Sequence, residues 1–235
     1  MKRSRHRKPT GRTGYHAPGG DGVEFHELVF PDSKEEIEDF IVEAAIKAAA
    51  SSDEVFPALL GPPGRNPENH FDYTIETGSD AEYLELMEVV VLPKKSEGYE
   101  DGATRYDPRE MADQVWKQIK RKSRKYGARR QALHLLLYAT DWRFELSPVV
   151  VELLSCLLAR RHHVFRTIFF VSPNKTTVDP LFPVKLTEED CKAIEAKRSI
   201  AIRPDPTRGE KHGPNAISLP LARNERPLRR SRRDP

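Results

Sequence analysis

Residues 132–139 (Ala-Leu-His-Leu-Leu-Leu-Tyr-Ala) form a nearly continuous apolar run with no polar alternation. A run of this kind is typical of a strand that is covered on both faces. Helical periodicity precedes it at about 108–126, and a Ser-Pro helix start follows at residues 147 and 148. We therefore expect an α/β fold, in which a mixed central sheet is flanked by helices.

Charge is distributed unevenly along the 235 residues, although the net charge is only +3. Residues 1–20 carry six Lys/Arg and no acids, and residues 203–235 carry nine Lys/Arg and four acids, so the rest of the chain is acidic. Both ends are also rich in Pro and Gly, which favours disorder. We expect one α/β domain at 22–202 between disordered basic tails at 1–21 and 203–235. Such tails attract nucleic-acid phosphates or serve only as solubilising ends.

The composition excludes several settings. No apolar run is long enough to span a bilayer, and no signal-peptide pattern follows the basic start. The two cysteines, Cys156 and Cys191, fit neither a disulfide framework nor a zinc site. A reducing cytoplasm is the expected location, no membrane partner is expected, and the oligomeric state is left open.

Other elements follow from periodicity and capping. Ser33 and Glu36 form a capping box that starts a helix at 34–50, and Glu43 lies at the border of its apolar stripe as a solvated flank. The remaining expected elements are a possible edge strand at 55–60 (because of Pro57), hairpin strands at 71–76 and 82–92, a helix ending near 160, a strand at 164–171 and a short helix at 187–197.

The hairpin carries two acids, Asp72 and Glu85. Side chains alternate faces along a strand, so Glu85 shares a face with Tyr83 and Met87. A carboxylate in the first strand that faces one in the second gives an oxygen-rich site suited to Mg²⁺. The alternative is a pair of solvated carboxylates at a sheet edge.

The helix at 108–126 has an apolar stripe of Met111, Val115 and Ile119. An advance of three residues from Ile119 reaches Lys122, which therefore falls within the inward stripe. Either its ammonium group snorkels to solvent, or it lies beside a carboxylate site and neutralises developing phosphate charge. Elsewhere the helix is basic, and we expect five of its residues to contact nucleic acid: Lys117, Lys120, Arg121, Arg124 and Lys125.

The order helix, three strands, helix, strand (αβββαβ) resembles the core of the restriction-endonuclease-like PD-(D/E)xK nuclease superfamily. Phe71-Asp72 corresponds to its Pro-Asp, and Glu85-Leu86-Met87 to its acid-x-lysine, with 12 residues between Asp72 and Glu85. The resemblance implies that Asp72 and Glu85 bind Mg²⁺ and that a lysine orients or activates the attacking water.

The chain departs from that pattern because Phe71 replaces proline and Met87 replaces the catalytic lysine. Some relatives supply the lysine from the following helix, where this chain has Lys122. Lys94 and Lys95 are further candidates, beyond the end of the strand.

Three classes of function remain at this stage. The first is a Mg²⁺-dependent nuclease, in which Asp72, Glu85 and Lys122 are catalytic. The second is a non-catalytic nucleic-acid- or protein-binding module with a degenerate nuclease-like fold. The third is an α/β structural or assembly protein. The sequence lacks a phosphate-binding Gly-rich loop and a serine-hydrolase elbow.

Overall fold

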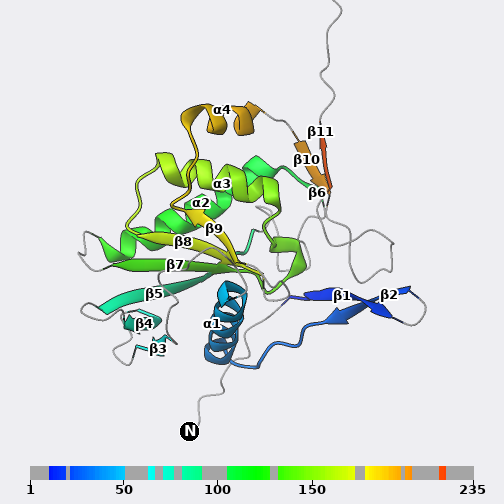
Figure 1. Cartoon of the computed structure of the whole chain (residues 1–235), viewed down its shortest axis with the longest axis vertical. Helices are drawn as coiled ribbons and strands as arrows, with labels where there is room; N and C mark the ends of the chain where they lie inside the picture. The colour runs from blue at the N-terminus through cyan, green and yellow to red at the C-terminus, as the bar shows by residue number, and fades with distance from the viewer. Residues whose placement is uncertain are drawn as a thin grey trace, which may run out of the picture.

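A six-stranded mixed sheet forms the centre of the molecule, in the order β3-β4-β5-β7-β8-β9 (Figure 1). The computed structural model describes residues 11–19, 22–50, 63–66, 71–76, 81–91, 105–127, 132–172, 178–196, 199–202 and 217–220. The strands of this sheet are β3 Gly64–Arg65, β4 Tyr73–Glu76, β5 Ala81–Glu88, β7 Leu133–Tyr138, β8 Thr167–Val171 and β9 Val178–Phe182.

Strand direction changes across the sheet. β3, β4 and β5 form an antiparallel meander, whereas β5, β7 and β8 are parallel to one another. Parallel neighbours need a crossover connection. Helix α2 (Pro108–Tyr126) lies within the connection from β5 to β7, and α3 (Pro148–Arg160) connects β7 to β8. The expected α/β fold with a mixed sheet flanked by helices is confirmed.

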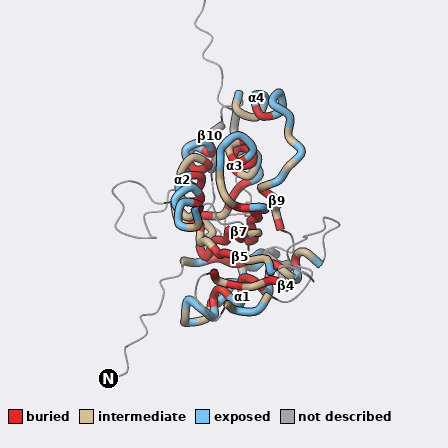
Figure 2. The backbone as a smooth tube through the Cα atoms, turned by 90° about the vertical axis from the view of Figure 1, so that its left-hand side faces the viewer, coloured by how far each residue is buried: buried red, intermediate tan, exposed pale blue. Residues whose placement is uncertain are grey.

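Two apolar clusters cover the two faces of the sheet. Helix α1 (Lys34–Ala50) packs with Leu84 and Leu86 on one face, whereas α2 and α3 pack on the other, where Tyr83 and Met87 lie (Figures 1 and 2). Every residue of β7 is buried, as its unbroken apolar sequence predicts. Because of this alternation, Glu85 points towards α2.

The helix ends agree with the capping signals. The Ser33 hydroxyl accepts from the Glu36 amide, and the Glu36 carboxylate accepts from the Ser33 amide, so the capping box is formed. Asp107 caps α2, which ends at Gly127 with a positive φ of 57°. The Glu43 side chain is 69% exposed, which confirms it as a solvated flank.

Several short elements were not expected from the sequence. Strand β9 contains Pro180, which a sheet tolerates there because β9 is an edge strand. Other unexpected elements are β3, which lies in a stretch expected to be a loop, the 3₁₀ turn Trp142–Phe144, and a second sheet of β6 (Arg105–Tyr106), β10 (Ser199–Ile202) and β11 (Ile217–Pro220). The last expected helix is present as α4 (Glu188–Ala196), whereas the possible strand at 55–60 lies outside the described residues.

The expected disordered tails differ from the structure in two places. Strand β1 (Gly14–Gly19), within the proposed tail at 1–21, pairs with β2 (Gly22–Glu27), and β11 in the C-terminal tail pairs with β10. The N-terminal segment is anchored because the Trp142 amide donates to the Arg12 carbonyl at 2.9 Å, and because Thr13 is fully buried. Composition favoured disorder, but these contacts with distant residues order the chain.

Among the helices in the described part of the chain, none has the length and apolar character that a bilayer crossing requires. Cys156 and Cys191 are buried free thiols. Burial raises the pKa of the Cys156 thiol to about 12, and a hydrogen bond with Cys191 acts in the same direction.

His134 is a hydrogen-bonded histidine in the core, at the start of β7. Its Nδ1 lies 2.5 Å from the Thr167 hydroxyl, and its Nε2 lies 2.8 Å from the Glu82 carboxylate. A neutral ring protonated at Nε2 satisfies both contacts. Burial lowers the pKa of His134 below its ordinary value, although the hydrogen bond and charge of Glu82 act in the opposite direction.

This pKa predicts a pH-dependent stability. As pH falls through about 6.5, the unfolded chain takes up a proton on His134 before the native protein does, so the free energy of unfolding decreases. Between pH 7.5 and 5.5, we expect the free energy of unfolding to decrease by about 1 kcal/mol less in His134→Gln than in the unchanged protein. Urea denaturation at each pH measures it, and the pH-dependent decrease is compared rather than absolute stability. An unchanged decrease in His134→Gln would contradict the lowered pKa.

Candidate active site at the β4–β5 hairpin and helix α2

The hairpin register brings Asp72 next to Glu85. Tyr73 of β4 pairs with Leu84 of β5, so Asp72, one residue before β4, falls opposite Glu85. The Asp72 Oδ2 atom accepts from the Leu86 amide at 2.7 Å. Because β4 begins only at Tyr73, the Leu86 amide binds this carboxylate in place of a backbone carbonyl of β4. The bond fixes the orientation of the Asp72 side chain.

Helix α2 brings the Lys122 ammonium group to the same point. Its Nζ lies 2.7 Å from the Glu85 Oε2 and 3.9 Å from the Asp72 Oδ2. It also donates to the Leu86 carbonyl at 2.6 Å. Val115 and Ile119 anchor the preceding turns of α2 in the core, so the helical phase turns Lys122 towards β5. The three residues selected from the sequence therefore converge.

Glu85 is the most buried member of this group, with a side chain only 3% exposed. Burial raises its pKa above the ordinary value, because desolvation disfavours the charged form. The Lys122 charge lowers this pKa, the neighbouring Asp72 carboxylate raises it, and a Tyr126 hydrogen bond lowers it. The ammonium group is thus the main group that stabilises a charged Glu85 here.

The two departures from the nuclease pattern have structural reasons. Met87 shares the face of Glu85 and packs with the apolar cluster beneath α2, and the lysine that lies next to Glu85 is Lys122 of that helix. Phe71 is buried, and its ring lies 4.3 Å from that of Tyr83 and 5.5 Å from that of Tyr126. This aromatic cluster holds the chain that leads into Asp72. Lys94 and Lys95 lie outside the described residues.

Sequence reasoning missed a second ion pair near the carboxylates, between Lys34 and Glu38 of α1, at 3.1 Å. Burial lowers the pKa of Lys34, but Glu38 raises it, and Asp72 and Glu85 raise it further, so the net shift is upward. Lys34 is therefore within electrostatic reach of both carboxylates. The sequence did contain a signal for this pair: Glu38 precedes Ile41 and Val42 by one helical turn, which places it on the buried side of α1.

The basic residues of α2 chosen for nucleic-acid contact are all exposed, and they have no acidic partner among the described residues. These residues are Lys117, Lys120, Arg121, Arg124 and Lys125. At 100° per residue, Lys120 and Arg124 lie on nearly the opposite side of the helix from Lys122. The structure therefore does not bring these two residues to the carboxylate site.

The oxygen atoms around Lys122 are the ligands that a hard cation prefers: two carboxylates and one backbone carbonyl. Mg²⁺ usually binds through one or two carboxylates and completes its shell with water and substrate phosphates. Within the described residues, no cluster of three or more Asp, Glu, His or Cys side chains is arranged to hold a metal. Two carboxylates and one carbonyl are oxygen donors of the kind that Mg²⁺ takes.

Comparison of the chain with protein-family models, with curated proteins and with solved structures finds no match in any of the three.

The buried ion pair predicts a large effect of Lys122→Met on stability. Loss of the ammonium group leaves the Glu85 carboxylate buried without a charged partner, which costs about 3–5 kcal/mol for such pairs. We expect the double variant Lys122→Met/Glu85→Gln to recover much of this loss, because no buried charge remains. Urea denaturation at pH 7 gives both values.

Lys117→Met is the matched control, because Lys117 is an exposed lysine on the same helix. It should change the free energy of unfolding by less than about 0.5 kcal/mol. If Lys122→Met costs no more than Lys117→Met, the pair with Glu85 does not contribute as described.

Proposed function

We propose that this protein is a Mg²⁺-dependent phosphodiesterase that acts on nucleic acid. The observation that carries the proposal is the convergence of Asp72, Glu85 and Lys122, with the ammonium group 2.7 Å from Glu85 and 3.9 Å from Asp72. Two carboxylates beside one ammonium group are the charges that phosphodiester hydrolysis uses, because they hold a metal ion and stabilise the phosphate.

The strand arrangement supports the resemblance to the PD-(D/E)xK superfamily. Helix α1 is followed by the β3-β4-β5 meander, and α2 then leads to β7, which lies parallel to β5. The acids lie before β4 and within β5, as the resemblance implies. We propose that Lys122 substitutes for the lysine that is absent at Met87.

The proposed roles follow from position. Asp72 is the more accessible carboxylate, at 25% exposed, and Glu85 lies deeper, at 3%. Together with the Leu86 carbonyl they would hold Mg²⁺, which lowers the pKa of bound water and neutralises charge at phosphorus. Lys122, once displaced from these oxygens, would stabilise the phosphate or orient the attacking water.

Metal titration is the first test of this proposal. We expect isothermal titration with Mg²⁺ or Mn²⁺ to show binding that Asp72→Asn or Glu85→Gln abolishes. Both substitutions preserve side-chain size and remove charge, and circular dichroism checks that each variant is folded. Unchanged binding in both variants would reduce the triad to a structural ion pair.

Hydrolysis is the second test. Single- and double-stranded DNA and RNA oligonucleotides are incubated with the full chain and Mg²⁺, with a chelator as the blank. We expect Lys122→Gln to slow cleavage by about 10²–10³-fold, the usual effect of removing one group that stabilises transition-state charge. Lys192→Gln, at an exposed position on α4, should cleave as the unchanged protein does. Equal rates in the two variants would exclude a role for Lys122.

The alternative is a non-catalytic nucleic-acid- or protein-binding module of the same fold. It is favoured by one observation: Lys122 is already satisfied by Glu85 and the Leu86 carbonyl, as a structural bridge would be. In that case Lys122→Gln would lower stability, whereas nucleic-acid binding would persist and no cleavage of any substrate would be detected with Mg²⁺ or Mn²⁺.

A further inference from the structure

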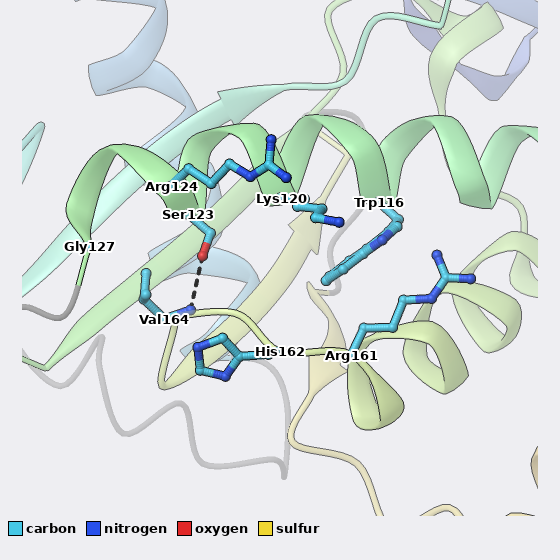
Figure 3. Close-up of a pocket in the computed structure, with 8 residues that line it drawn as sticks. All are labelled: Trp116, Lys120, Ser123, Arg124, Gly127, Arg161, His162 and Val164. Atoms are coloured by element: carbon cyan, nitrogen blue, oxygen red, sulfur yellow. Dashed lines mark hydrogen bonds between the residues drawn. The ribbon is translucent and has the colours of Figure 1, made fainter.

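A cavity of about 670 Å³ lies on the flank of α2 away from Glu85. One wall is the C-terminal half of α2, with Lys120 and Arg124, and the other is the segment after α3, with Arg161 and His162 (Figure 3). Cavities of 300–1,000 Å³ hold ligands of small-molecule size. The volume therefore exceeds what a bare phosphate or sulfate ion fills.

The charge of the cavity is one-sided. Of the eight lining residues that the structure describes, three are Lys or Arg, one is His162, and none is acidic. Lys120 and Arg124 have no acidic partner among the described residues. Arg161 lies 3.4 Å from Asp113, but both side chains are about half exposed, so solvent screens this pair. The cavity thus holds positive charge without an acidic partner on α2, and the Arg161 guanidinium adds to it from a separate segment.

A hydrogen bond and a cation–π contact hold the two walls of the cavity in place. The Ser123 hydroxyl accepts from the Val164 amide at 3.1 Å and ties α2 to the opposite wall (Figure 3). The Arg161 guanidinium lies 5.6 Å from the centre of the buried Trp116 ring, a cation–π contact that positions it at the cavity. A preformed site loses less entropy when it binds a ligand.

We propose that this cavity binds a phosphate group with its attached nucleoside, either in a free nucleotide or at the phosphorylated end of a nucleic-acid strand. Guanidinium groups recognise phosphate through paired N–H donors, and lysine adds a point charge. The remaining volume accommodates the sugar and base. At Gly127 no atom of the described residues lies within 4 Å of where a Cβ would be, so these residues leave that end of the cavity open.

This phosphate site is separate from the carboxylate site, and its occupation requires neither metal nor hydrolysis. Lys120 and Arg124 lie on nearly the opposite side of α2 from Lys122. The two proposals can therefore succeed or fail independently, and Asp72→Asn, which disables the carboxylate site, should leave phosphate binding unchanged.

Binding to the full chain is measured by isothermal titration with three probes: adenosine 5′-monophosphate, a 5′-phosphorylated oligonucleotide, and the same oligonucleotide with a 5′-hydroxyl. We expect Arg124→Gln and Arg161→Gln each to weaken the phosphorylated probes by at least tenfold. Lys185→Gln and Lys192→Gln, at exposed positions outside both α2 and the cavity, should change affinity by less than twofold.

The probes also distinguish the two sources of the phosphate. If the mononucleotide binds and the cavity variants lower its affinity, the ligand is a free nucleotide. If only the phosphorylated oligonucleotide binds and loses affinity in these variants, the ligand is a strand end. Equal binding of the 5′-hydroxyl oligonucleotide, equal losses in the control variants, loss of binding in Asp72→Asn, or no binding of any probe would each overturn the proposal.

Discussion

The ion pair between Lys122 and Glu85 links the helical layer to the sheet through a buried carboxylate. A buried carboxylate is tolerated only with a partner, and the apolar turns of α2 before Lys122 supply that partner at a fixed height above β5. Asp72 then takes its position from the Leu86 amide, whose neighbouring carbonyl accepts from Lys122. The geometry of the site therefore depends on the packing of α2.

Much of this arrangement follows from the sequence, because it depends on local periodicity. The helical phase that places Ile119 in the core also turns Lys122 inwards, and strand alternation places Glu85 on the face of Tyr83 and Met87. The bounds of α1 and α2 agree with their capping signals for the same reason: a helix end is determined by residues within one turn.

What the sequence did not predict depends on contacts between distant segments. The segment before β1 is held by the Trp142 amide, which donates to the Arg12 carbonyl, and β1 itself pairs with β2. The Gly-rich, basic composition of residues 1–20 gave no sign of this contact with Trp142. The cavity beside α2 joins Lys120 and Arg124 to Arg161, about 40 residues later in the chain, and no local pattern reports that proximity. Strand β9 was not predicted because it contains Pro180, and proline argues against a strand unless that strand lies at a sheet edge. The sequence does not show that β9 is the last strand of its sheet.

The two flanks of α2 have opposite electrostatic character, and this constrains any reaction with phosphate. Near the carboxylates, Asp72, Glu85 and Glu38 outnumber the ammonium groups of Lys34 and Lys122. A phosphodiester anion is repelled there unless a divalent cation reverses the charge. The basic cavity attracts phosphate without such help. The proposed capture of a phosphorylated ligand and the proposed hydrolysis would therefore be separable on this helix, and only hydrolysis would require Lys122 to leave its oxygen partners.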